Sequence, residues 1–342
     1  MNKTLKICLN AVAAVMVIAG GARAGEILNG AGATFPFPIY SKWFDVYAQK
    51  TGVRINYQSI GSGGGIRQIT KNTVDFGATD GPMSKKELYK VDGKLLHIPT
   101  VLGAVVPSFN LKETDGKKIE SLNLTGPVLA DIFLGNIRQW DDERIKAINA
   151  GVKLPGAPIV VVRRADGSGT TYAFVDYLSR VSPEWKKRVG VNTSVQWPIG
   201  LGAKGNEGVS GLIMQTPNSF GYVEAIYAKQ NNLAMAAMKN KAGEYVVASV
   251  ESIQAAAAGA ARSMPPDFRV SISDAEGKGA YPISTYTWML VREKNRGGKG
   301  ALLKKFLDWM LEEGQEIAPE LGYAPLPDQV KKMVSEAITK IK

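Results

Sequence analysis

The chain has very few of the side chains on which metal sites and many enzymes depend. Its 342 residues include one cysteine, Cys8, and one histidine, His97. A zinc site needs several His or Cys ligands and a Ser-His-Asp triad needs a placed histidine, so neither has enough material here. His97 lies between the apolar residues Leu96 and Ile98, and we interpret it as structural. Walker A and nucleophile-elbow motifs are also missing, and we expect no metal or other cofactor.

The sequence also lacks an apolar run long enough to cross a bilayer. Residues 11–19 are apolar, but this run is too short for a spanning helix. It follows Lys3 and Lys6 and precedes small residues that end at Ala24, which is the pattern of a signal peptide. We predict a signal peptide over residues 1–24, cleavage after Ala24 and export to a periplasm as a soluble protein. The alternative is an uncleaved membrane anchor.

The position of Cys8 bears on the exported form of the protein. This cysteine precedes the apolar run, so it is not the lipidated cysteine that follows a lipoprotein signal. We therefore expect a mature chain with no thiol, no disulfide and no lipid anchor.

Acidic residues are outnumbered by basic ones. The chain has 42 Lys and Arg against 31 Asp and Glu, a formal net charge of +11. Such a balance can indicate a nucleic-acid partner. However, the basic residues are scattered, and no basic block alternates with aromatic residues. We expect no nucleic acid among the partners.

Short strands alternate with helices along the chain, which predicts an α/β fold with parallel sheets. The strand predicted at 158–162, for example, is apolar throughout and precedes glycine and hydroxyl residues. The principal helices are predicted from apolar residues at helical spacing, and they cover 38–50, 66–72, 172–178 and 301–313, the last ending at Gly314.

The length of the chain predicts two lobes, because more than 300 residues exceed what one core usually holds. Two long apolar stretches, 98–110 and 281–291, are interpreted as strands that cross between the lobes and form a hinge. We predict a signal peptide followed by one lobe from residues 25–104 and 283–342 and a second, inserted lobe from residues 105–282. The alternative is two consecutive domains joined by a linker.

The most informative segment is RRADGSGTT at 163–171, between the strand at 158–162 and a predicted helix. Glycine and hydroxyl residues at a helix start direct backbone N–H groups and the positive end of the helix dipole at one point. Arg164 adds a planar guanidinium suited to a tetrahedral oxyanion. The segment predicts a binding site for a small anion, with phosphate as the first candidate.

Similar turns follow other strands. Thr34 lies in one at 30–36 and Ser62 in another at 61–65, and such turns meet at the carboxyl ends of strands. Asp80 ends a further strand. Because an ionised Asp only accepts hydrogen bonds, it would accept from the O–H that phosphate retains and repel sulfate, which has none. Asp166 is interpreted as the residue that orients Arg164.

Each of these features also has a purely structural explanation. The alternatives are helix capping by Thr34, Ser168 and Thr170, a flexible loop at 61–65, a turn shaped by Asp80, and a surface ion pair between Arg164 and Asp166. Three such turns together with one arginine and one aspartate favour a shared anion site. The GxGxxG match at 200–205 follows no clear strand and is interpreted as a loop before a helix.

Motifs spread along nearly the whole chain resemble those of one known family. They are GAGATFP at 30–36, GSGGG at 61–65, VDFGATD at 74–80, RRADGSGT at 163–170, WPIGLG at 197–202, GYVEA at 221–225 and YAPLP at 323–327. The chain resembles the periplasmic phosphate-binding proteins of phosphate ABC transporters. The resemblance implies a two-lobed α/β solute-binding protein, with a mixed sheet flanked by helices in each lobe, that closes on dehydrated phosphate.

The resemblance also implies which residues contact phosphate. They are Thr34, Phe35, Ser62, Asp80, Arg164, Ser168, Gly169 and Thr170, with Asp166 behind Arg164. Gly63, Thr79 and Gly81 depart from the residues common in the family, but none of these departures removes a ligand-bearing side chain.

The partners implied are inorganic phosphate and the inner-membrane permease subunits of an ABC transporter with their cytoplasmic ATPase. We expect a periplasmic monomer that binds phosphate reversibly and makes or breaks no bond, hence no enzyme. A receptor for another oxyanion such as sulfate and a secreted phosphate-ester hydrolase are the alternatives.

Overall fold

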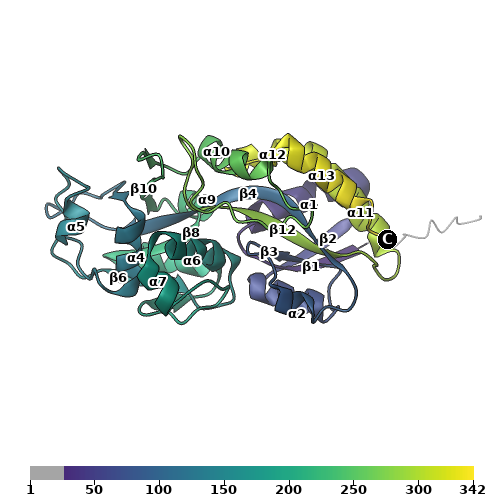
Figure 1. Cartoon of the computed structure of the whole chain (residues 1–342), viewed down its shortest axis with the longest axis horizontal. Coiled ribbons are helices and arrows are strands. Elements are labelled where there is room, and N and C mark those ends of the chain that lie inside the picture. Colours follow the sequence, from purple (N-terminus) through teal and green to yellow (C-terminus); the bar gives the residue numbers. More distant parts are fainter. Residues whose placement is uncertain (1–26) are drawn as a thin grey trace, which may run out of the picture.

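The computed structural model describes residues 27–342, so the predicted signal peptide and its cleavage site lie outside the described residues. The molecule is elongated and has two lobes (Figure 1). The long strand β4 (Leu95–Asn110) runs from one lobe into the other, beside β12 (Ser284–Arg292). The predicted two-lobed α/β architecture is confirmed. Among residues 27–342, no helix is both long and apolar enough to cross a membrane.

Within the described residues, a nine-stranded mixed sheet extends through both lobes in the order β2-β1-β3-β12-β4-β8-β6-β7, with β9 paired to β4. A separate small sheet has the order β11-β10-β5. Besides β4 and β12, the strands are β1 Ile27–Gly32, β2 Arg54–Ser59, β3 Phe76–Thr79, β5 Asn123–Leu124, β6 Val160–Arg164, β7 Leu201–Ala203, β8 Ser219–Glu224, β9 Ala234–Met235, β10 Ala237–Lys239 and β11 Tyr245–Val246.

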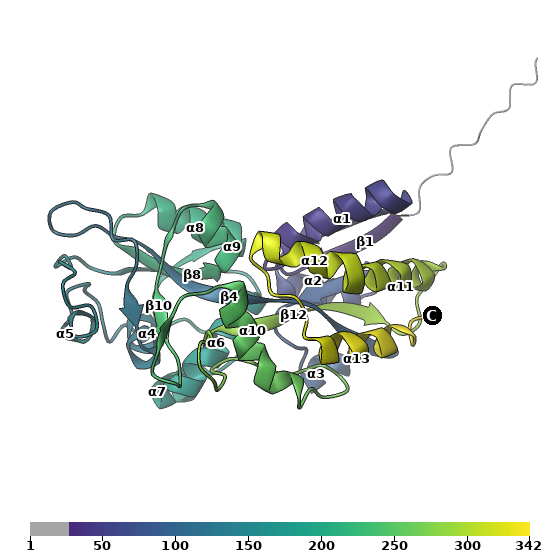
Figure 2. The same cartoon turned by 90° about the horizontal axis from the view of Figure 1, so that it is seen from above.

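Helices cover the sheet in both lobes, and the C-terminus returns to the lobe that contains β1 (Figure 2). The α-helices are α1 Phe37–Thr51, α2 Ser62–Thr70, α3 Lys85–Leu88, α4 Gly126–Leu134, α5 Glu143–Lys146, α6 Gly169–Val181, α7 Pro183–Arg188, α8 Gly205–Gln215, α9 Ala225–Gln230, α10 Val250–Ala261, α11 Lys299–Trp309, α12 Gln315–Ile317 and α13 Asp328–Ile338. A π-helical turn at Met310–Gly314 and a 3₁₀ turn at Ala318–Leu321 flank α12.

Strand β4 changes its partner where it passes between the lobes. Residues 95–104 pair with β12, and residues 105–110 pair with β8. The lobe that contains β1 thus uses the first part of β4, and the other lobe uses the second part. The lobe boundaries remain a prediction, and this change of partner is a physical reason to place one of them after residue 104.

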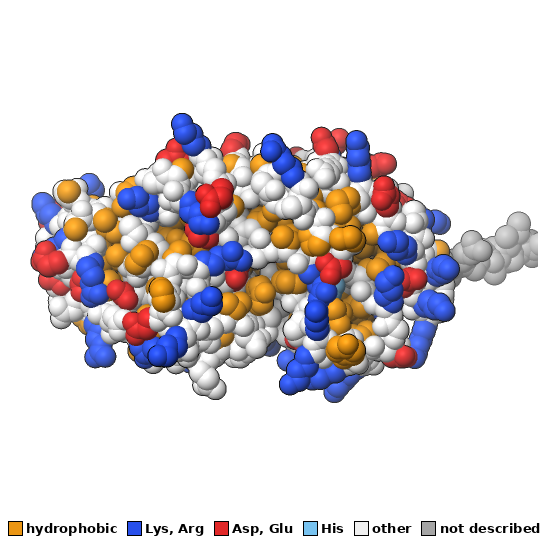
Figure 3. Space-filling model, viewed as in Figure 1, with side chains coloured by type: hydrophobic (Ala, Val, Ile, Leu, Met, Phe, Trp, Pro, Cys, Tyr) orange, Lys and Arg blue, Asp and Glu red, His pale blue; other side chains and the backbone are white. Residues whose placement is uncertain are grey.

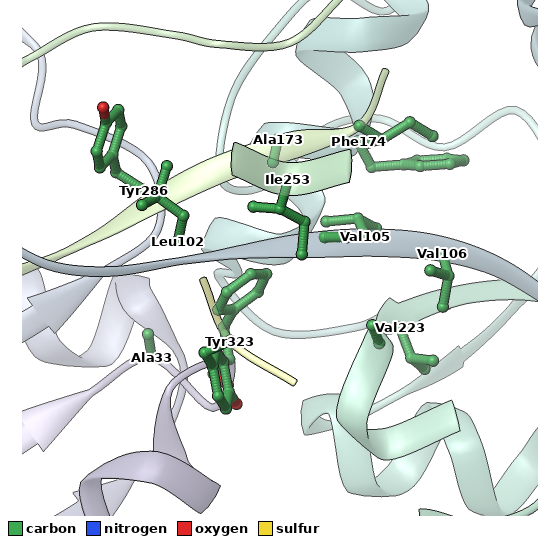
Figure 4. Close-up of a cluster of buried hydrophobic side chains, with 14 of the residues drawn as sticks. Ala33, Leu102, Val105, Val106, Ala173, Phe174, Val223, Ile253, Tyr286 and Tyr323 are labelled. Atoms are coloured by element: carbon green, nitrogen blue, oxygen red, sulfur yellow. The ribbon is translucent and has the colours of Figure 1, made fainter. Parts of the chain in front are cut away.

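The apolar core is continuous across this junction (Figure 4). Leu102 and Val105 of β4 are buried together with Tyr323 on one side and with Phe174 of α6 and Val223 of β8 on the other. These side chains belong to one cluster of buried residues. The strands that join the lobes are therefore held by packing of buried apolar side chains.

Two helix predictions need correction. The helix predicted to begin at Ile66 begins at Ser62, so the glycines of 61–65 form a helix start and not a flexible loop. The helix predicted to end at Gly314 continues through it into α12, and Gly314 has ordinary helical dihedral angles. The glycine serves close packing instead, because Trp43 Nε1 donates to the Gly314 carbonyl at 2.7 Å and leaves little room for a side chain.

Helix α2 packs closely on the sheet. Alanine substitutions of its glycines test this packing. A Cβ on Gly65 would lie 2.6 Å from Gly32 Cα and 2.7 Å from the Ala31 carbonyl oxygen, both backbone atoms that cannot move aside. We expect Gly65→Ala to lower the free energy of unfolding by about 1–3 kcal/mol in urea titrations, as for other overpacked sites.

Gly211 of α8 is the matched control, because a Cβ added there would meet open space, with no neighbouring atom within 4 Å beyond its own stretch of helix. Gly211→Ala should be neutral or stabilising by up to about 1 kcal/mol, since alanine favours a helix interior. An unchanged or increased stability of Gly65→Ala would contradict the close packing of α2.

Candidate functional site

The turns that follow β1, β2 and β3 meet the end of β6 between the two lobes. Thr34 follows β1, Ser62 begins α2 and Asp80 follows β3 in one lobe. Arg164 ends β6 in the other lobe. These four side chains are at most 3% exposed. The structure therefore brings residues as distant in sequence as Thr34 and Arg164 into one buried polar cluster.

Ser62 joins the two lobes directly. Its hydroxyl oxygen accepts a hydrogen bond from the backbone N–H of Gly169, at 2.9 Å, and from the backbone N–H of Asp80, at 3.3 Å. Nearby, the N–H of Gly63 donates to the carbonyl of Gly167 at 2.9 Å. The start of α6 is thereby held against the start of α2.

Gly169 is closely surrounded, which explains why a glycine stands there. A Cβ on it would lie 2.5 Å from both Asp80 N and Ser62 Oγ. The N-terminus of α6 therefore approaches Asp80 at a distance that a side chain would forbid. Ser168 caps this helix, because its hydroxyl accepts from Thr171 N at 3.0 Å. The helix-capping interpretation thus holds for Ser168, which is also fully buried beside the site.

Arg164 is not part of a surface pair. It is 2% exposed, and its Nε and Nη2 donate to the two carboxylate oxygens of Asp166 at 2.8 and 2.6 Å. Its Nη1 donates to the hydroxyl of Thr170 at 3.4 Å. Three of the five N–H groups of the guanidinium are used in this way, which leaves two for a bound anion.

Asp166 holds the guanidinium of Arg164 in place. Burial acts to raise the pKa of Asp166, but the hydrogen bonds and the charge of Arg164 outweigh it and leave that pKa below its usual value. Asp166 also accepts from Gly205 N at 3.1 Å. The carboxylate is thus fixed on both sides, as a residue that orients a guanidinium should be.

Asp80 lies in the same cluster and does not shape its own turn. The turn is held by Thr79, whose hydroxyl donates to the Gly81 carbonyl at 2.6 Å. One Asp80 oxygen accepts from the hydroxyl of Thr287 at 2.6 Å, and the other lies 3.5 Å from Ser62 Oγ. Burial raises the pKa of Asp80 to about 7, against the lowering effects of Thr287, Arg164 and Ser62.

The turn at Thr34 and Phe35 is held by tyrosines. Tyr227 donates its hydroxyl to the Thr34 carbonyl at 2.6 Å, and Tyr323 donates to the Phe35 carbonyl at 2.6 Å. Thr34 does not cap α1, whose N-cap position is Pro36. The Thr34 hydroxyl instead accepts from Asn206 Nδ2 at 2.9 Å. The capping alternative for Thr34 is wrong.

Sequence reasoning missed Asn206 and Thr287 as members of this cluster. Asn206 lies in the first turn of α8 and contacts Thr34 and Thr170, and Thr287 of β12 contacts Asp80. The GxGxxG match at 200–205, interpreted from the sequence as a loop, instead contains the short strand β7 and leads directly into α8. A glycine followed by a polar residue at a helix start is the signal that could have pointed to this turn.

His97 has a structural role, as predicted. It is buried, and its Nε2 accepts from the backbone N–H of Met83 at 3.1 Å. Burial lowers its pKa to about 3, so the ring is neutral and can accept this bond.

A cleft of about 620 Å³ opens beside the site. Ser84 and Glu87 line it from the first lobe and Tyr172 and Thr193 from the second. Tyr172 contacts Gly81, next to Asp80, and the Thr193 carbonyl accepts from Ser168 N at 2.8 Å. The residues that line this cleft thus neighbour the buried cluster, but Thr34, Ser62, Asp80 and Arg164 do not line it.

About nine-tenths of the chain matches known proteins at the level of sequence. The profile of the PBP superfamily domain matches residues 18–313. The phosphate-binding protein PstS of Pasteurella multocida is 45% identical over 321 residues, which is 93% of this chain and 91% of that protein. The protein of the same name from Xylella fastidiosa (strain Temecula1) is 47% identical over 309 residues, or 90% of this chain and 83% of its own.

Solved structures share the fold. A phosphate ABC transporter substrate-binding protein of Clostridium perfringens, described as putative and solved with bound phosphate, has a TM-score of 0.63 at 19% identity and covers 88% of this chain and 100% of its own. A phosphate-binding protein from Stenotrophomonas maltophilia has a TM-score of 0.67 at 19% identity, with 91% and 93% coverage. These similarities confirm the two-lobed fold.

The raised pKa of Asp80 gives the ligand-free protein a characteristic pH dependence. An unfolded Asp has a pKa near 3.9, well below the value of about 7 in the fold. A raised pKa contributes stability that is fully present below the unfolded pKa and is lost as the pH rises through the folded pKa. We expect the free energy of unfolding of the wild type to fall relative to Asp80→Asn between about pH 4 and pH 7, by up to about 1.4 kcal/mol per pH unit.

Urea titrations in phosphate-free buffer at several pH values measure this difference. Carboxyl groups that do not interact with Asp80, such as Asp328, titrate alike in both proteins and cancel in the comparison. The charge of Asp80 contributes to the raised pKa of Glu224, so the comparison is repeated with Glu224→Gln in both proteins. A difference that stays constant with pH would show that Asp80 is ionised in the fold throughout this range.

Proposed function

The chain belongs to the PBP superfamily and, within it, to the family of phosphate-binding proteins named PstS, and on this premise we propose that it captures inorganic phosphate and delivers it to an ABC transporter. One observation carries the proposal. The turns at Thr34, Ser62 and Gly169 converge with Arg164 at one buried place between two lobes. Burial of a multiply charged anion is favourable only where its oxygens are met by hydrogen bonds, and this cluster supplies donors from both lobes.

We propose that the phosphate contacts are Thr34, Phe35, Ser62, Asp80, Arg164, Ser168, Gly169 and Thr170. The two remaining N–H groups of Arg164 and the N-terminus of α6 supply positive potential. Hydroxyl groups supply neutral donors. Asp166 acts through Arg164 and makes no contact of its own.

Asp80 gives the proposed site its preference among oxyanions. A carboxylate can accept a hydrogen bond from the O–H of phosphate, whereas it meets only repulsion from sulfate. Its pKa of about 7 and the hydrogen bond from Thr287 are consistent with a carboxyl that shares a proton with its ligand near neutral pH.

We propose that the receptor works in the periplasm as a monomer and that the lobes, residues 25–104 with 283–342 and residues 105–282, close about the strands that join them. The permease subunits of the transporter would recognise the closed form. The proposal includes no bond-making step, in line with relatives that are named as binding proteins. On the face shown in Figure 3, basic and acidic side chains both occur over both lobes.

Removal of the buried guanidinium is the most direct test. We expect Arg164→Ala to weaken phosphate binding by about 3–5 kcal/mol in titration calorimetry, because the buried anion and Asp166 both lose their charge partner. Arg188→Ala is the control, since Arg188 is exposed and pairs only with Glu184 at the surface. Wild-type affinity in Arg164→Ala would contradict the site, and saturable hydrolysis of a phosphomonoester that depends on Arg164 would favour the hydrolase.

Asp80 is tested by comparing two anions of the same shape. The wild type should bind phosphate far more tightly than sulfate at pH 7. In Asp80→Asn the amide can donate to sulfate, so phosphate affinity should fall, sulfate affinity should rise, and the ratio of the two dissociation constants should shrink by at least about tenfold. Equal affinities of the wild type for the two anions would end the role assigned to Asp80.

A further inference from the structure

Three of the hydroxyl groups in the site, those of Ser62, Thr34 and Thr170, share one hydrogen-bond pattern. A hydroxyl oxygen can accept about two hydrogen bonds and donate one. Ser62 Oγ accepts from two backbone N–H groups, those of Gly169 and Asp80. An N–H group cannot accept in return. Both acceptor positions of the Ser62 hydroxyl are thereby filled, so toward any further group this hydroxyl can act only as a donor.

Thr34 shows the same pattern with a single partner residue. Its Oγ1 accepts from the side-chain amide of Asn206, at 2.9 Å from Nδ2, and from the backbone N–H of Asn206, at 3.2 Å. Both acceptor positions are filled from one residue of the opposite lobe. The hydroxyl hydrogen of Thr34 is left for a further acceptor.

Thr170 completes the set. Its Oγ1 accepts from Asn206 Nδ2 at 3.2 Å and from Arg164 Nη1 at 3.4 Å. One amide group of Asn206 thus contacts the two threonine hydroxyls, Thr34 from one lobe and Thr170 from the other. Its two N–H bonds provide one donor for each of them.

The orientation of the Asn206 amide is fixed by a backbone group. Its Oδ1 accepts from Glu224 N at 3.0 Å. Because a backbone N–H can only donate, the oxygen of the amide must face Glu224, and the nitrogen must face the threonines. Asn206 is fully buried, so water does not compete for these bonds.

We propose that Asn206 is a positioning residue for phosphate: it fills the acceptor positions of Thr34 and Thr170 and so fixes both hydroxyls as donors to the anion. This inference rests on the proposed function of the site. Donors that are oriented before binding need no reorganisation when the anion arrives, which favours affinity. Asn206 itself needs no contact with the ligand to have this effect.

The first experiment removes the amide. We expect Asn206→Ala to raise the dissociation constant for phosphate by about tenfold or more, because hydrogen bonds to a charged ligand weaken when their donors become free to turn away. Asn149→Ala is the matched control. Asn149 is also buried and makes hydrogen bonds to Asn123 and Ile145, outside the phosphate site, so its loss should lower stability and leave phosphate affinity unchanged.

The second experiment separates positioning from a general structural role. Asn206→Ala is combined with serine at both threonine positions, Thr34→Ser and Thr170→Ser, and separately with valine, Thr34→Val and Thr170→Val. The loss should persist with serine, which keeps the hydroxyls, and should fall to less than about twofold with valine, which removes them. If Asn206→Ala does not fold, Asn206→Asp is compared in the same two backgrounds, where the effect of its added charge is common to both.

The outcomes separate this inference from the proposed function. A wild type that does not bind phosphate overturns both. A wild type that binds, with Asn206→Ala binding equally well or losing the same factor in the serine and valine backgrounds, overturns the positioning role alone. A loss that depends on the threonine hydroxyls supports it.

Discussion

The two hydrogen bonds accepted by Ser62 Oγ tie the start of α6 in one lobe to the turn at Asp80 in the other. One comes from Gly169 at the start of α6 in the second lobe, and the other from Asp80 in the first. They are possible only because Gly169 has no side chain, since a Cβ there would lie 2.5 Å from Ser62 Oγ. The direction of α6, and with it the helix dipole and the position of Thr170, depends on this contact.

The charges of the site are balanced before any ligand is present. Arg164 is paired with Asp166, and burial brings the pKa of Asp80 to about 7, so Asp80 is only partly ionised near neutral pH. A multiply charged anion in this site would therefore be stabilised mainly by oriented hydrogen bonds and by the helix dipole, and less by a surplus of cations. Oriented dipoles suffice in a buried site because little water is present to screen them.

Most features of the site that could be predicted from the sequence were predicted from short local motifs. The turns at Thr34, Ser62 and Asp80 follow β1, β2 and β3, which pair in parallel, so their meeting at one edge was predictable from strand order. Arg164 ends β6, which runs opposite to β3 in the mixed sheet, so its approach from the other lobe was not predictable in this way. Asn206 and Thr287 were not predictable either, because their contacts with Thr34 and Asp80 span 172 and 207 residues and carry no local pattern. The two lobes were predictable from the length of the chain, and the two long apolar stretches predicted the strands that join them, β4 and β12.

The lobes are joined in two physically different ways, by apolar packing at β4 and by polar contacts at the site. This difference is compatible with a stable fold that binds its ligand reversibly. At β4 they share a buried apolar core that includes Leu102 and Val105, whose exposure would cost free energy in proportion to apolar area. At the site they meet through polar contacts, such as Ser62 with Gly169 and Thr34 with Asn206. Water can replace such contacts at a net cost of only about 0.5–1.5 kcal/mol each. Separation of the lobes therefore costs least at the site and most at β4, which favours the proposed closure about the strands that join the lobes.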